Sequence, residues 1–453
     1  MSEKVDALVV GAGIAGLTAA ERLMAAGRSV RVIEARDRVG GRTEGGTFAS
    51  GTPIELGGQW VGPTQDEALA LIDRLGLETF RVHDEGAGLL FASGGREEAI
   101  DDSFGLPGAS AQAFRDLVAY IDELASRVDL SSPWTSSEAA ALDVMTAAEW
   151  LSRECRDDLA RDFLHVLLGS IFAAETHEYS ALHMLFYLGS GGGLHRMMLT
   201  VGGAQEARVK GGTHQISERL AAALLASDPH AISLGEQVLK VLDWDTDGPA
   251  TVVTGTRSIA ADKVILAMPP AMMARIHAEP ALPANVHAAQ THMLPGSVLK
   301  FQVEYPSPFW RDAGLSGTVL SLDHHVSLVY DNCVPDSDRG ILVAFVEGAH
   351  ARTFDELDET QRSARVLRDL RDFFGEQAET PTEVLQRNWS EEPFTRGCYG
   401  GRYGTGLWTT LGPKLAAPCG SLHFAGAETS AVWNGYIDGA IRSGQRVAAE
   451  ILA

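Results

Sequence analysis

The chain has 453 residues, of which 45% are hydrophobic, and is therefore long enough to form two domains with a large buried core. Its formal net charge of -23 argues against nucleic acid and anionic membranes as partners, but it is compatible with the attraction of small cations. The four cysteines form no C-x-x-C pair and the histidines have no metal-ligand spacing, so we expect a reducing compartment and no metal site. Since neither a secretory signal nor an apolar run of about 20 residues is present, we expect a cytoplasmic protein without a membrane anchor. These features do not determine the oligomeric state, and a homodimer is compatible with them.

The first predicted elements form a dinucleotide-binding fingerprint. The sequence VVGAGIAG at 9–16 ends an apolar strand with three glycines, and a helix is expected over 14–26. The glycines allow a tight turn and a close approach to a pyrophosphate, at which the helix N-terminus points. Glu34 follows at the end of a second apolar strand, where a carboxylate can accept hydrogen bonds from a ribose. Three glycines alone would indicate only a turn, but this order of elements predicts a cofactor that contains ADP.

A second glycine turn follows the predicted ribose-binding strand. The sequence VGGRT at 39–43 places Gly41 and Arg42 there, which a simple NAD dehydrogenase would not need. The segment from Glu34 to Arg42 resembles the double motif of the flavin-dependent amine oxidase and phytoene desaturase superfamily. This resemblance implies that Arg42 lies beside the phosphates of FAD, so FAD is the expected cofactor.

The remaining elements alternate between two patterns. Alternating strands and helices continue to about residue 77, and a capping box at 64–67 predicts a helix that ends near residue 76. Loops and long helices follow, then the first pattern returns, a second excursion follows, and the chain makes a final return to the first pattern near Trp389. The later predicted elements are helices at 111–128, after a capping box at 146–149, near 164–188 and at 215–225, antiparallel strands within 237–265, strands at 298–303 and 342–346, and helices at 360–374 and 439–452.

Several separated motifs resemble those of the flavin-containing monoamine oxidase family, and they cover nearly the whole chain. The motifs are IELGGQWVGPTQ at 54–65, AETHEYSAL at 174–182, GSVLK at 296–300, NWSEE at 388–392, GCY at 397–399, FAGAET at 424–429 and WNGY at 433–436. The resemblance implies an α/β fold of the amine oxidase type, in which a Rossmann-type FAD-binding domain is interleaved with an α+β substrate-binding domain. We expect the FAD-binding domain at 1–79, 205–290 and 390–453, and the substrate-binding domain at 80–204 and 291–389.

The resemblance assigns catalytic roles to Tyr399, Tyr436 and Lys300. The two tyrosine rings would stand as the walls of an amine cage, whose apolar, electron-rich surface favours the neutral amine. Lys300 would hold a water at the flavin N5 atom, which explains a lysine on an otherwise apolar strand better than a surface position does. Without its surrounding motif, each tyrosine would be assigned to ordinary core packing.

The fingerprint and the resemblance together assign a larger set of residues to the cofactor. Trp389 would pack beside the isoalloxazine, although tryptophan is also a common core residue, and the strand at Val238 would contact the adenine. The full set is Gly11, Gly13, Ala15, Gly16, Glu34, Ala35, Arg36, Gly41, Arg42, Gly57, Gly58, Gln59, Trp60, Val238, Trp389, Cys398, Gly426, Ala427, Glu428, Gly435, Tyr436 and Ile437.

Cys398 raises the question of a covalent flavin. The sequence GCY at 397–399 is similar to the family motif whose cysteine forms a thioether with the flavin, but the flanking residues differ from that motif. The hypothesis of FAD bound covalently through Cys398 therefore stands beside that of FAD held without a bond.

The resemblance also indicates positions that line or gate the substrate cavity. These are Ile171, Phe172, Met197, Met198, Gln205 and Tyr330. Methionines at such positions adapt to apolar amines of different shape, although helix packing would explain the two methionines equally well. No carboxylate occurs at 326–329, before Tyr330, so we expect monoamines rather than diamines as substrates.

These expectations describe an oxidase that converts a small-molecule amine, dioxygen and water to aldehyde, ammonia and hydrogen peroxide, by hydride transfer to the flavin and hydrolysis of the released iminium. The alternatives are an oxidase of diamines, polyamines or heterocyclic amines, an FAD-dependent desaturase, and a non-catalytic flavin-binding protein. A desaturase would not need the tyrosine pair or Lys300, and an interaction protein would not need the whole cage. Oxidation of an amino acid would need an arginine for its carboxylate, for which Arg196 and Arg396 are candidates.

Overall fold

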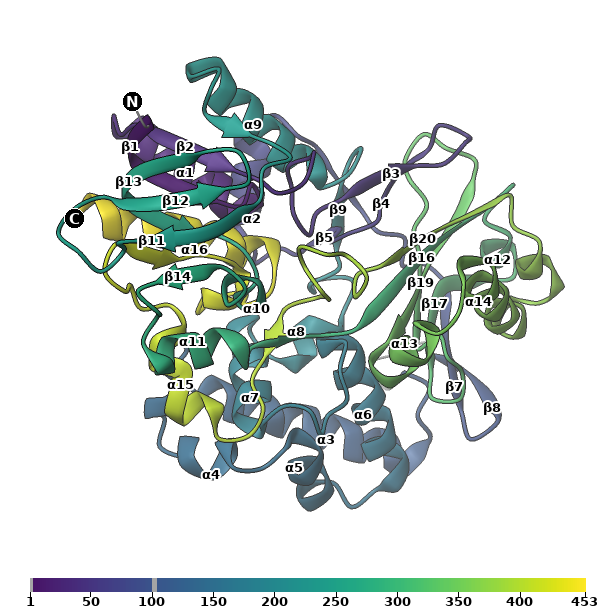
Figure 1. Ribbon diagram of the computed structural model, residues 1–453. Coiled ribbons are helices and arrows are strands. Elements are labelled where there is room, and N and C mark those ends of the chain that lie inside the picture. The colour runs from purple at the N-terminus through teal and green to yellow at the C-terminus, as the bar shows by residue number, and fades with distance from the viewer. Residues whose placement is uncertain (1–2, 100–103) are drawn as a thin grey trace.

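Two large β-sheets and a group of helices form the architecture of the protein in a computed structural model, which describes residues 3–99 and 104–453 (Figure 1). The first sheet has a parallel part, in which β1 lies between β2 and β13, and an antiparallel part formed by β11, β12 and β13. Its order is β10 (Ile232–Ser233), β2 (Val30–Ile33), β1 (Glu3–Val10), β13 (Ser258–Leu266), β12 (Ala250–Thr254), β11 (Val238–Leu242) and β14 (His277–Glu279), and β22 (Leu422–Phe424) also pairs with β13.

The parallel strands of this sheet end at one edge. Val10 of β1 pairs with Ile33 of β2 on one side and with Leu266 of β13 on the other. The apolar side chains around this sheet form a core with α1 (Ile14–Ala25), α9 (His214–Ser227) and α16 (Ile437–Leu452). Because a cofactor binds at the carboxyl ends of the strands in such sheets, this edge is where the glycine fingerprint is needed.

The second sheet is mainly antiparallel and lies apart from the first (Figure 1). All eight positions of β16 and all eight of β19 are buried, so both faces of these strands are covered. Its order is β20 (Glu383–Asn388), β16 (Val298–Tyr305), β19 (Gly340–Glu347), β18 (Leu328–Asp331), β17 (Leu315–Ser321), β7 (Ala87–Ala92) and β8 (Gly95–Ala99). The sheet thus carries a lysine, Lys300, in the middle of a fully buried strand.

The helices of the central segment form a separate apolar core. The sequence predicts one helix near 164–188, and this prediction is wrong because two helices occupy the region. The first ends where Ala173 adopts a left-handed conformation, and the second begins where the Ser180 side chain accepts a hydrogen bond from the backbone of His183. These helices are α3 (Gly108–Ser126), α4 (Ala139–Asp143), α5 (Ala147–Glu154), α6 (Asp158–Phe172), α7 (Ala181–Ser190) and α8 (Leu194–Met198).

The capping box predicted at 146–149 is present, whereas the one predicted at 64–67 is wrong. The helix α2 (Asp66–Arg74) has no cap from its own preceding side chains. Its first N–H groups, those of Glu67 and Ala68, donate instead to the carboxylate of Asp438 at 2.8 and 3.0 Å. A carboxylate from the last helix therefore supplies the cap, which no local pattern could indicate.

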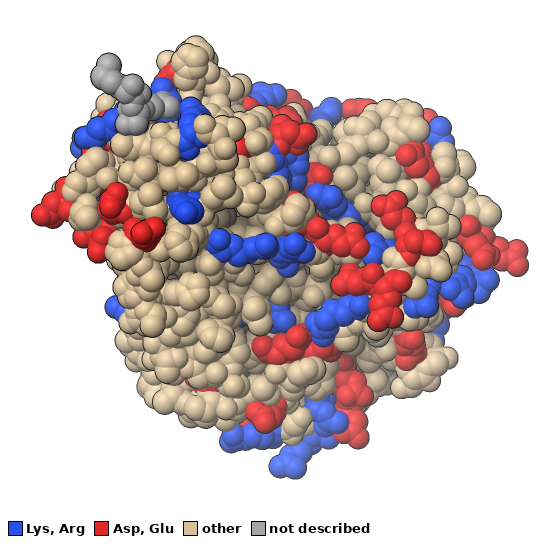
Figure 2. Space-filling view, in the orientation of Figure 1, with Lys and Arg blue, Asp and Glu red and all other residues tan. Residues whose placement is uncertain are grey.

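The remaining α-helices and strands complete the architecture. They are β3 (Gly45–Thr47), β4 (Pro53–Glu55), β5 (Trp60–Val61), β6 (Thr79–Arg81), β9 (Ala207–Val209), α10 (Pro270–Met273), α11 (Ala284–Thr291), β15 (Leu294–Pro295), α12 (Phe309–Asp312), α13 (Gly348–Phe354), α14 (Glu359–Phe374), β21 (Gly401–Arg402) and α15 (Leu407–Leu415). The predicted α/β fold with a Rossmann-like sheet and a second, antiparallel sheet is confirmed. The exact domain boundaries stay a prediction. On the face shown in Figure 2, acidic and basic side chains are interspersed, so the net charge there is spread over a mixed surface.

Candidate active site

One cavity of about 820 Å³ joins the edge of the first sheet to the inner face of the second sheet. A volume of this size lies in the upper part of the range for small-molecule and cofactor sites. Most of the residues predicted from the sequence line it. They are Gly11, Gly13, Ala15, Glu34, Ala35, Arg36, Gly41, Arg42, Gly57, Gly58, Gln59, Trp60, Ile171, Met197, Met198, Gln205, Val238, Lys300, Tyr330, Trp389, Cys398, Tyr399, Gly426, Ala427, Gly435, Tyr436 and Ile437.

Three residues of the predicted cofactor and substrate sets do not line the cavity, and neither does Arg196, whereas Arg396 does. Gly16 allows close contact, because a Cβ atom there would lie 2.1 Å from the carbonyl oxygen of Gly11. Phe172 stacks within the helical core, with its ring centroid 4.3 Å from that of Tyr179. Glu428 is buried behind the wall and bonds to Arg42.

The nucleotide end of the cavity is built by the turn between β1 and α1. Gly11 has φ +107°, and a Cβ atom there would meet the carbonyl oxygen of Ala267 at 2.5 Å, so only glycine fits. Gly13 is the N-cap of α1 and supplies no side-chain acceptor for the first N–H groups of the helix. A Cβ atom on Gly13 would have no neighbour within 4 Å, so the space before the helix is open. Free N–H groups that face an open space suit a phosphate.

Glu34 stands at the end of β2 with its carboxylate oriented by backbone groups. Its two oxygens accept hydrogen bonds from the N–H groups of Ala12, at 2.8 Å, and Arg36, at 3.0 Å. Arg36 also forms a short ion pair with Glu392, so its guanidinium is held between two carboxylates. The position fits the hydroxyl groups of a ribose, as predicted for this carboxylate.

Arg42 links the two halves of the cavity wall. Its guanidinium donates to both carboxylate oxygens of Glu428, at 2.6 and 2.9 Å, and to the carbonyl oxygen of Tyr399 at 2.6 Å. Burial opposes the charge of Arg42, but the Glu428 carboxylate outweighs this effect and raises the pKa of the arginine above its ordinary value. Glu428 therefore acts on the cavity through Arg42.

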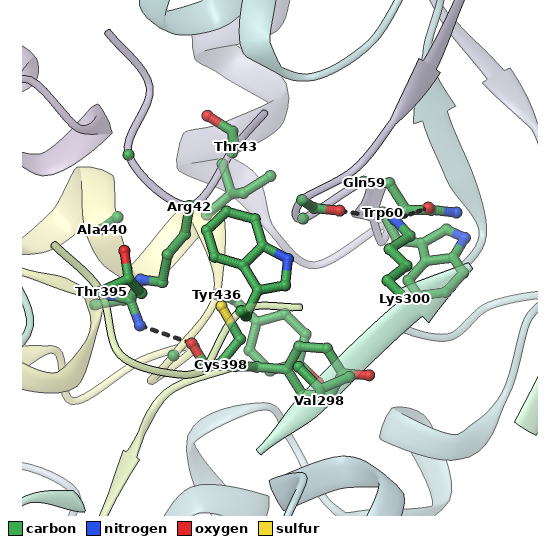
Figure 3. Close-up of a pocket in the computed structure, with 18 of the residues that line it drawn as sticks. Arg42, Thr43, Gln59, Trp60, Val298, Lys300, Thr395, Cys398, Tyr436 and Ala440 are labelled. Carbon is green, nitrogen blue, oxygen red and sulfur yellow. Dashed lines mark hydrogen bonds between the residues drawn. The ribbon is translucent and has the colours of Figure 1, made fainter. Parts of the chain in front are cut away.

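Lys300 extends from β16 into the cavity opposite Arg42 (Figure 3). Its side chain is buried, and the ammonium group donates to the carbonyl oxygen of Gly57 at 2.8 Å and, through a short contact, to the amide oxygen of Gln59. It also lies 5.9 Å from the centroid of the Trp60 ring. Burial lowers the pKa of Lys300 to about 7, against the opposing effect of Glu55. The lysine can therefore change its charge near neutral pH.

The two predicted cage residues both reach the cavity, from different segments of the chain. Tyr436 packs against Trp433, with ring centroids 4.9 Å apart, and its ring centroid lies 6.1 Å from that of Tyr187. The hydroxyl of Tyr399 donates to the carboxylate of Glu347 at 2.7 Å. Burial raises the pKa of both tyrosines, so their hydroxyls stay protonated and the rings stay neutral.

Cys398 lies between Arg42 and Tyr436 in the close-up view, with its side chain buried in the wall (Figure 3). Burial raises the pKa of its thiol to about 12, although the charge of Arg42 opposes this shift. Trp389, also in the wall, donates from its indole nitrogen to the carbonyl oxygen of Leu56 at 3.1 Å.

Sequence reasoning missed several residues of the cavity. Tyr187 of α7 and Phe345 of β19 add aromatic surface near the cage, and Asp84 adds a carboxylate. Burial raises the pKa of Asp84, with His83 opposing, and Asp84 in turn contributes to the raised pKa of Tyr330. Tyr187 and Phe345 lie in apolar stretches of the sequence, where an aromatic residue indicates only core packing. Asp84 lies in a loop without a recognisable motif.

The residues of this cavity fit FAD. The open space before α1 and the carboxylate of Glu34 suit the ADP part, and the wall of Trp389, Lys300 and Cys398 suits an aromatic ring system. Among the residues that the structure describes, no cluster of His, Cys, Asp and Glu is arranged to hold a metal ion. Within the same ranges, no helix is long and apolar enough to cross a membrane.

Comparison with known proteins points in the same direction. Residues 14–452 match the family model described as flavin containing amine oxidoreductase. The chain is 34% identical to amine oxidase (flavin-containing) B of Cavia porcellus, over 100% of this chain and 87% of the relative. Its fold is similar to that of wild-type putrescine oxidase bound to putrescine, with a TM-score of 0.94, 36% identity and 99% of each chain covered. It is also similar to cyclohexylamine oxidase from Brevibacterium oxydans, with a TM-score of 0.92, 32% identity and 99% and 98% of the two chains covered.

Proposed function

Because the chain belongs to the flavin-containing amine oxidoreductase family, we propose that it oxidises primary monoamines, with aryl or alkyl substituents, to aldehyde, ammonia and hydrogen peroxide. The observation that carries this proposal is the meeting of Tyr399, Tyr436 and Lys300 in the cavity that the glycine fingerprint opens. FAD, when bound, supplies the chemistry by accepting hydride from the α-carbon of the amine and passing the electrons to dioxygen.

The residues of the chain then bind and orient the amine. The neutral rings of Tyr399 and Tyr436 form an apolar sleeve that disfavours the ammonium form and aligns the reacting carbon. Burial of this sleeve excludes bulk water from the reacting centre. Lys300 holds a water molecule through its ammonium group, which is otherwise bonded only to neutral oxygens.

The part of the cavity wall formed by α6 and α8 bears on the class of amine. Ile171, Met197 and Met198 give this wall an apolar, adaptable surface, which supports monoamines. One observation favours a diamine instead: Asp84 also lines the cavity, and its carboxylate could pair with a second ammonium group. Asp84 is distant in sequence from residues 326–329, whose lack of a carboxylate led to the expectation of monoamines.

We also propose that FAD is attached through a thioether between the sulfur of Cys398 and the methyl-bearing ring of the flavin. The C–S bond would replace the S–H bond and one C–H bond of the methyl group, the flavin ring would take up the two hydrogens with their electrons, and dioxygen would reoxidise the ring to give hydrogen peroxide. Cys398 lines the cavity, and Arg42 lowers the cost of its thiolate although burial makes that form rare. Acid precipitation tests the bond, since a covalent flavin stays in the pellet. A yellow wild-type pellet and a colourless Cys398→Ala pellet support it, whereas wild-type flavin in the supernatant excludes it.

The function is tested by mixing the purified holoenzyme with aryl, alkyl and diamine substrates, first without oxygen and then with it. The expected result is bleaching of the flavin by primary arylalkyl amines, followed by release of peroxide in air. If flavin is present and no amine in the panel reduces it, the oxidase proposal is wrong. The cytoplasmic location and a homodimer stay predictions.

A further inference from the structure

A buried carboxyl group, Glu347, lies directly behind the amine cage and has no part in the function proposed above. Its side chain is at the end of β19 and does not line the cavity. One carboxylate oxygen accepts the hydrogen bond from the Tyr399 hydroxyl at 2.7 Å, and the other accepts from the Ser327 hydroxyl at 2.9 Å. Tyr399 itself does line the cavity, so this carboxyl group contacts the cage only from behind.

We propose that Glu347 is a positioning residue of the amine cage, which fixes the ring of Tyr399 through the hydrogen bond to its hydroxyl. Its role in turnover rests on the proposed oxidase function, whereas its contact with the tyrosine does not. The sheet keeps the carboxyl in place, because Glu347 pairs with Val298 of β16, and Val298 also lines the cavity. The tyrosine is thereby tied to the same strand that carries Lys300.

Glu347 has neutral hydrogen-bond partners and no counter-ion among them. Burial raises the pKa of Glu347 to about 7, while the hydroxyls of Tyr399, Ser170 and Ser327 oppose the shift. Tyr330 on β18 is also close enough for the charge of Glu347 to contribute to the raised pKa of that tyrosine. On the side of α13, the carboxylate of Glu175 bonds to the N–H of Ala349 instead.

The charge of Glu347 therefore changes near neutral pH, and its effect on the tyrosine changes with it. Above pH 7 the carboxylate accepts a charge-assisted hydrogen bond from Tyr399, which is stronger than a bond between neutral groups. Below pH 7 the protonated carboxyl can donate to the tyrosine oxygen and fixes its hydroxyl less firmly. We expect the cage to be best ordered on the alkaline side of this transition.

The test compares the holoenzyme with four variants: Glu347→Gln, Glu347→Leu, Tyr399→Phe and the double variant Tyr399→Phe with Glu347→Leu. Glu304→Gln is the control, because Glu304 is a fully buried carboxylate on β16 that bonds to Ser50 and does not line the cavity. Infrared difference spectra between pH 6 and 8 report the protonated carboxyl directly. The rate of flavin reduction by an arylalkyl amine without oxygen reports the cage.

The expected infrared result is a carboxyl band that grows as the pH falls through about 7. It should disappear in Glu347→Gln, change position in Tyr399→Phe and persist in Glu304→Gln. An unchanged band in Tyr399→Phe overturns the proposed contact. This readout does not depend on catalysis, so it decides the contact even if no amine reduces the flavin.

The expected kinetic result is that Glu347→Leu slows flavin reduction roughly tenfold, the effect of losing one hydrogen bond to a charged group. Tyr399→Phe should have a similar effect, and the double variant should be no slower than the slower single variant. Glu347→Gln should retain most of the rate and lose the part of its pH dependence that belongs to the carboxyl. Multiplying effects in the double variant would show that Glu347 acts independently of Tyr399 and would overturn the proposal.

Discussion

The nucleotide end and the amine end of the cavity treat buried charge in opposite ways. At the nucleotide end, the guanidinium of Arg42 is matched by the carboxylate of Glu428 in a two-bond ion pair. At the amine end, Lys300 and Glu347 are buried with neutral hydrogen-bond partners. Burial then lowers the pKa of the lysine and raises that of the carboxyl, each to about 7.

The difference teaches that the charge of Arg42 is stabilised by the carboxylate of Glu428, whereas Lys300 and Glu347, which have only neutral hydrogen-bond partners, can change their charge near neutral pH. An ion pair that is buried keeps its charges over a wide pH range, and breaking it is costly. A buried group without a counter-ion gives up its charge at a moderate pH instead. Variants that remove charge at each end should therefore fail in different ways.

The largest expected effect is the loss of the charge at the nucleotide end. Arg42→Ala leaves the Glu428 carboxylate buried without its partner and removes the donor to the carbonyl oxygen of Tyr399. We expect the free energy of unfolding to fall by about 3 kcal/mol, together with weaker retention of FAD. Chemical denaturation and the ratio of flavin to protein measure the two effects.

Arg74→Ala is the matched control for this variant. Arg74 forms the same kind of two-bond pair with Glu21, at 2.7 and 2.8 Å, but its side chain is 54% exposed. Such a surface pair contributes less than about 1 kcal/mol. Equal losses in the two variants would show that burial does not distinguish the Arg42 pair, and the comparison between the ends of the cavity would fail.

The second prediction concerns Lys300 at the amine end. Lys300→Met should keep the bound FAD and slow flavin reduction or reoxidation by roughly a hundredfold, since it removes the ammonium group proposed to hold a water molecule. Anaerobic reduction and oxygen-mixing experiments separate the two half-reactions. Unchanged rates in both would place Lys300 outside the reaction, and exposed Lys240→Met should leave both rates unchanged.

The same variant has a predicted effect on stability with a definite sign. The pKa of Lys300 falls from 10.5 to about 7 on folding, so between these values the unfolded chain binds more protons than the folded one. The free energy of unfolding of the wild type therefore increases as the pH rises through this window. Below pH 7 the lysine is charged in the folded state, and its burial lowers the free energy of unfolding by the full amount. Lys300→Met should gain most stability relative to wild type near pH 6 and progressively less toward pH 10.

The third prediction tests the cap that the sequence did not indicate. Asp438→Ala removes the acceptor for the first N–H groups of α2 and should lower the free energy of unfolding by about 1 to 2 kcal/mol. Thr64→Ala is the control, because its hydroxyl has no hydrogen-bond partner and the predicted capping box is absent. If Thr64→Ala lowered the free energy of unfolding more than Asp438→Ala does, Thr64 and not Asp438 would be the residue that caps α2.

These cases show which parts of the structure a sequence can reveal. The turn at Gly11 and Gly13 depends on residues next to one another, so their spacing predicted the fold of the nucleotide end. The cap at Asp438 and the division at Ala173 depend on contacts made after folding, and the local patterns gave wrong predictions there.

The candidate site divides in the same way. Lys300, Tyr399 and Tyr436 were expected because each lies in a motif, whereas Glu347 ends an apolar strand and Asp84 lies in a loop without one. Their relevance comes from the segments that folding places beside them. Three-dimensional packing, which spacing does not encode, is therefore what brings the carboxyl groups to the amine end.

The smallest expected effect concerns Asp84, which lies at the amine end but is more exposed than Lys300 and Glu347. A carboxylate there can pair with the second ammonium group of a diamine, but solvent screening limits the gain to about 1 kcal/mol or less. Asp84→Asn should raise KM for 1,4-diaminobutane about two- to fivefold and leave KM for butylamine unchanged. The difference should shrink as salt is added, because screening weakens an exposed pair.

Glu85→Gln, next to Asp84 but outside the cavity wall, should change neither KM. Equal KM changes for both amines would mean that Asp84 shapes the cavity without recognising charge, and that only the buried groups at this end act on the substrate.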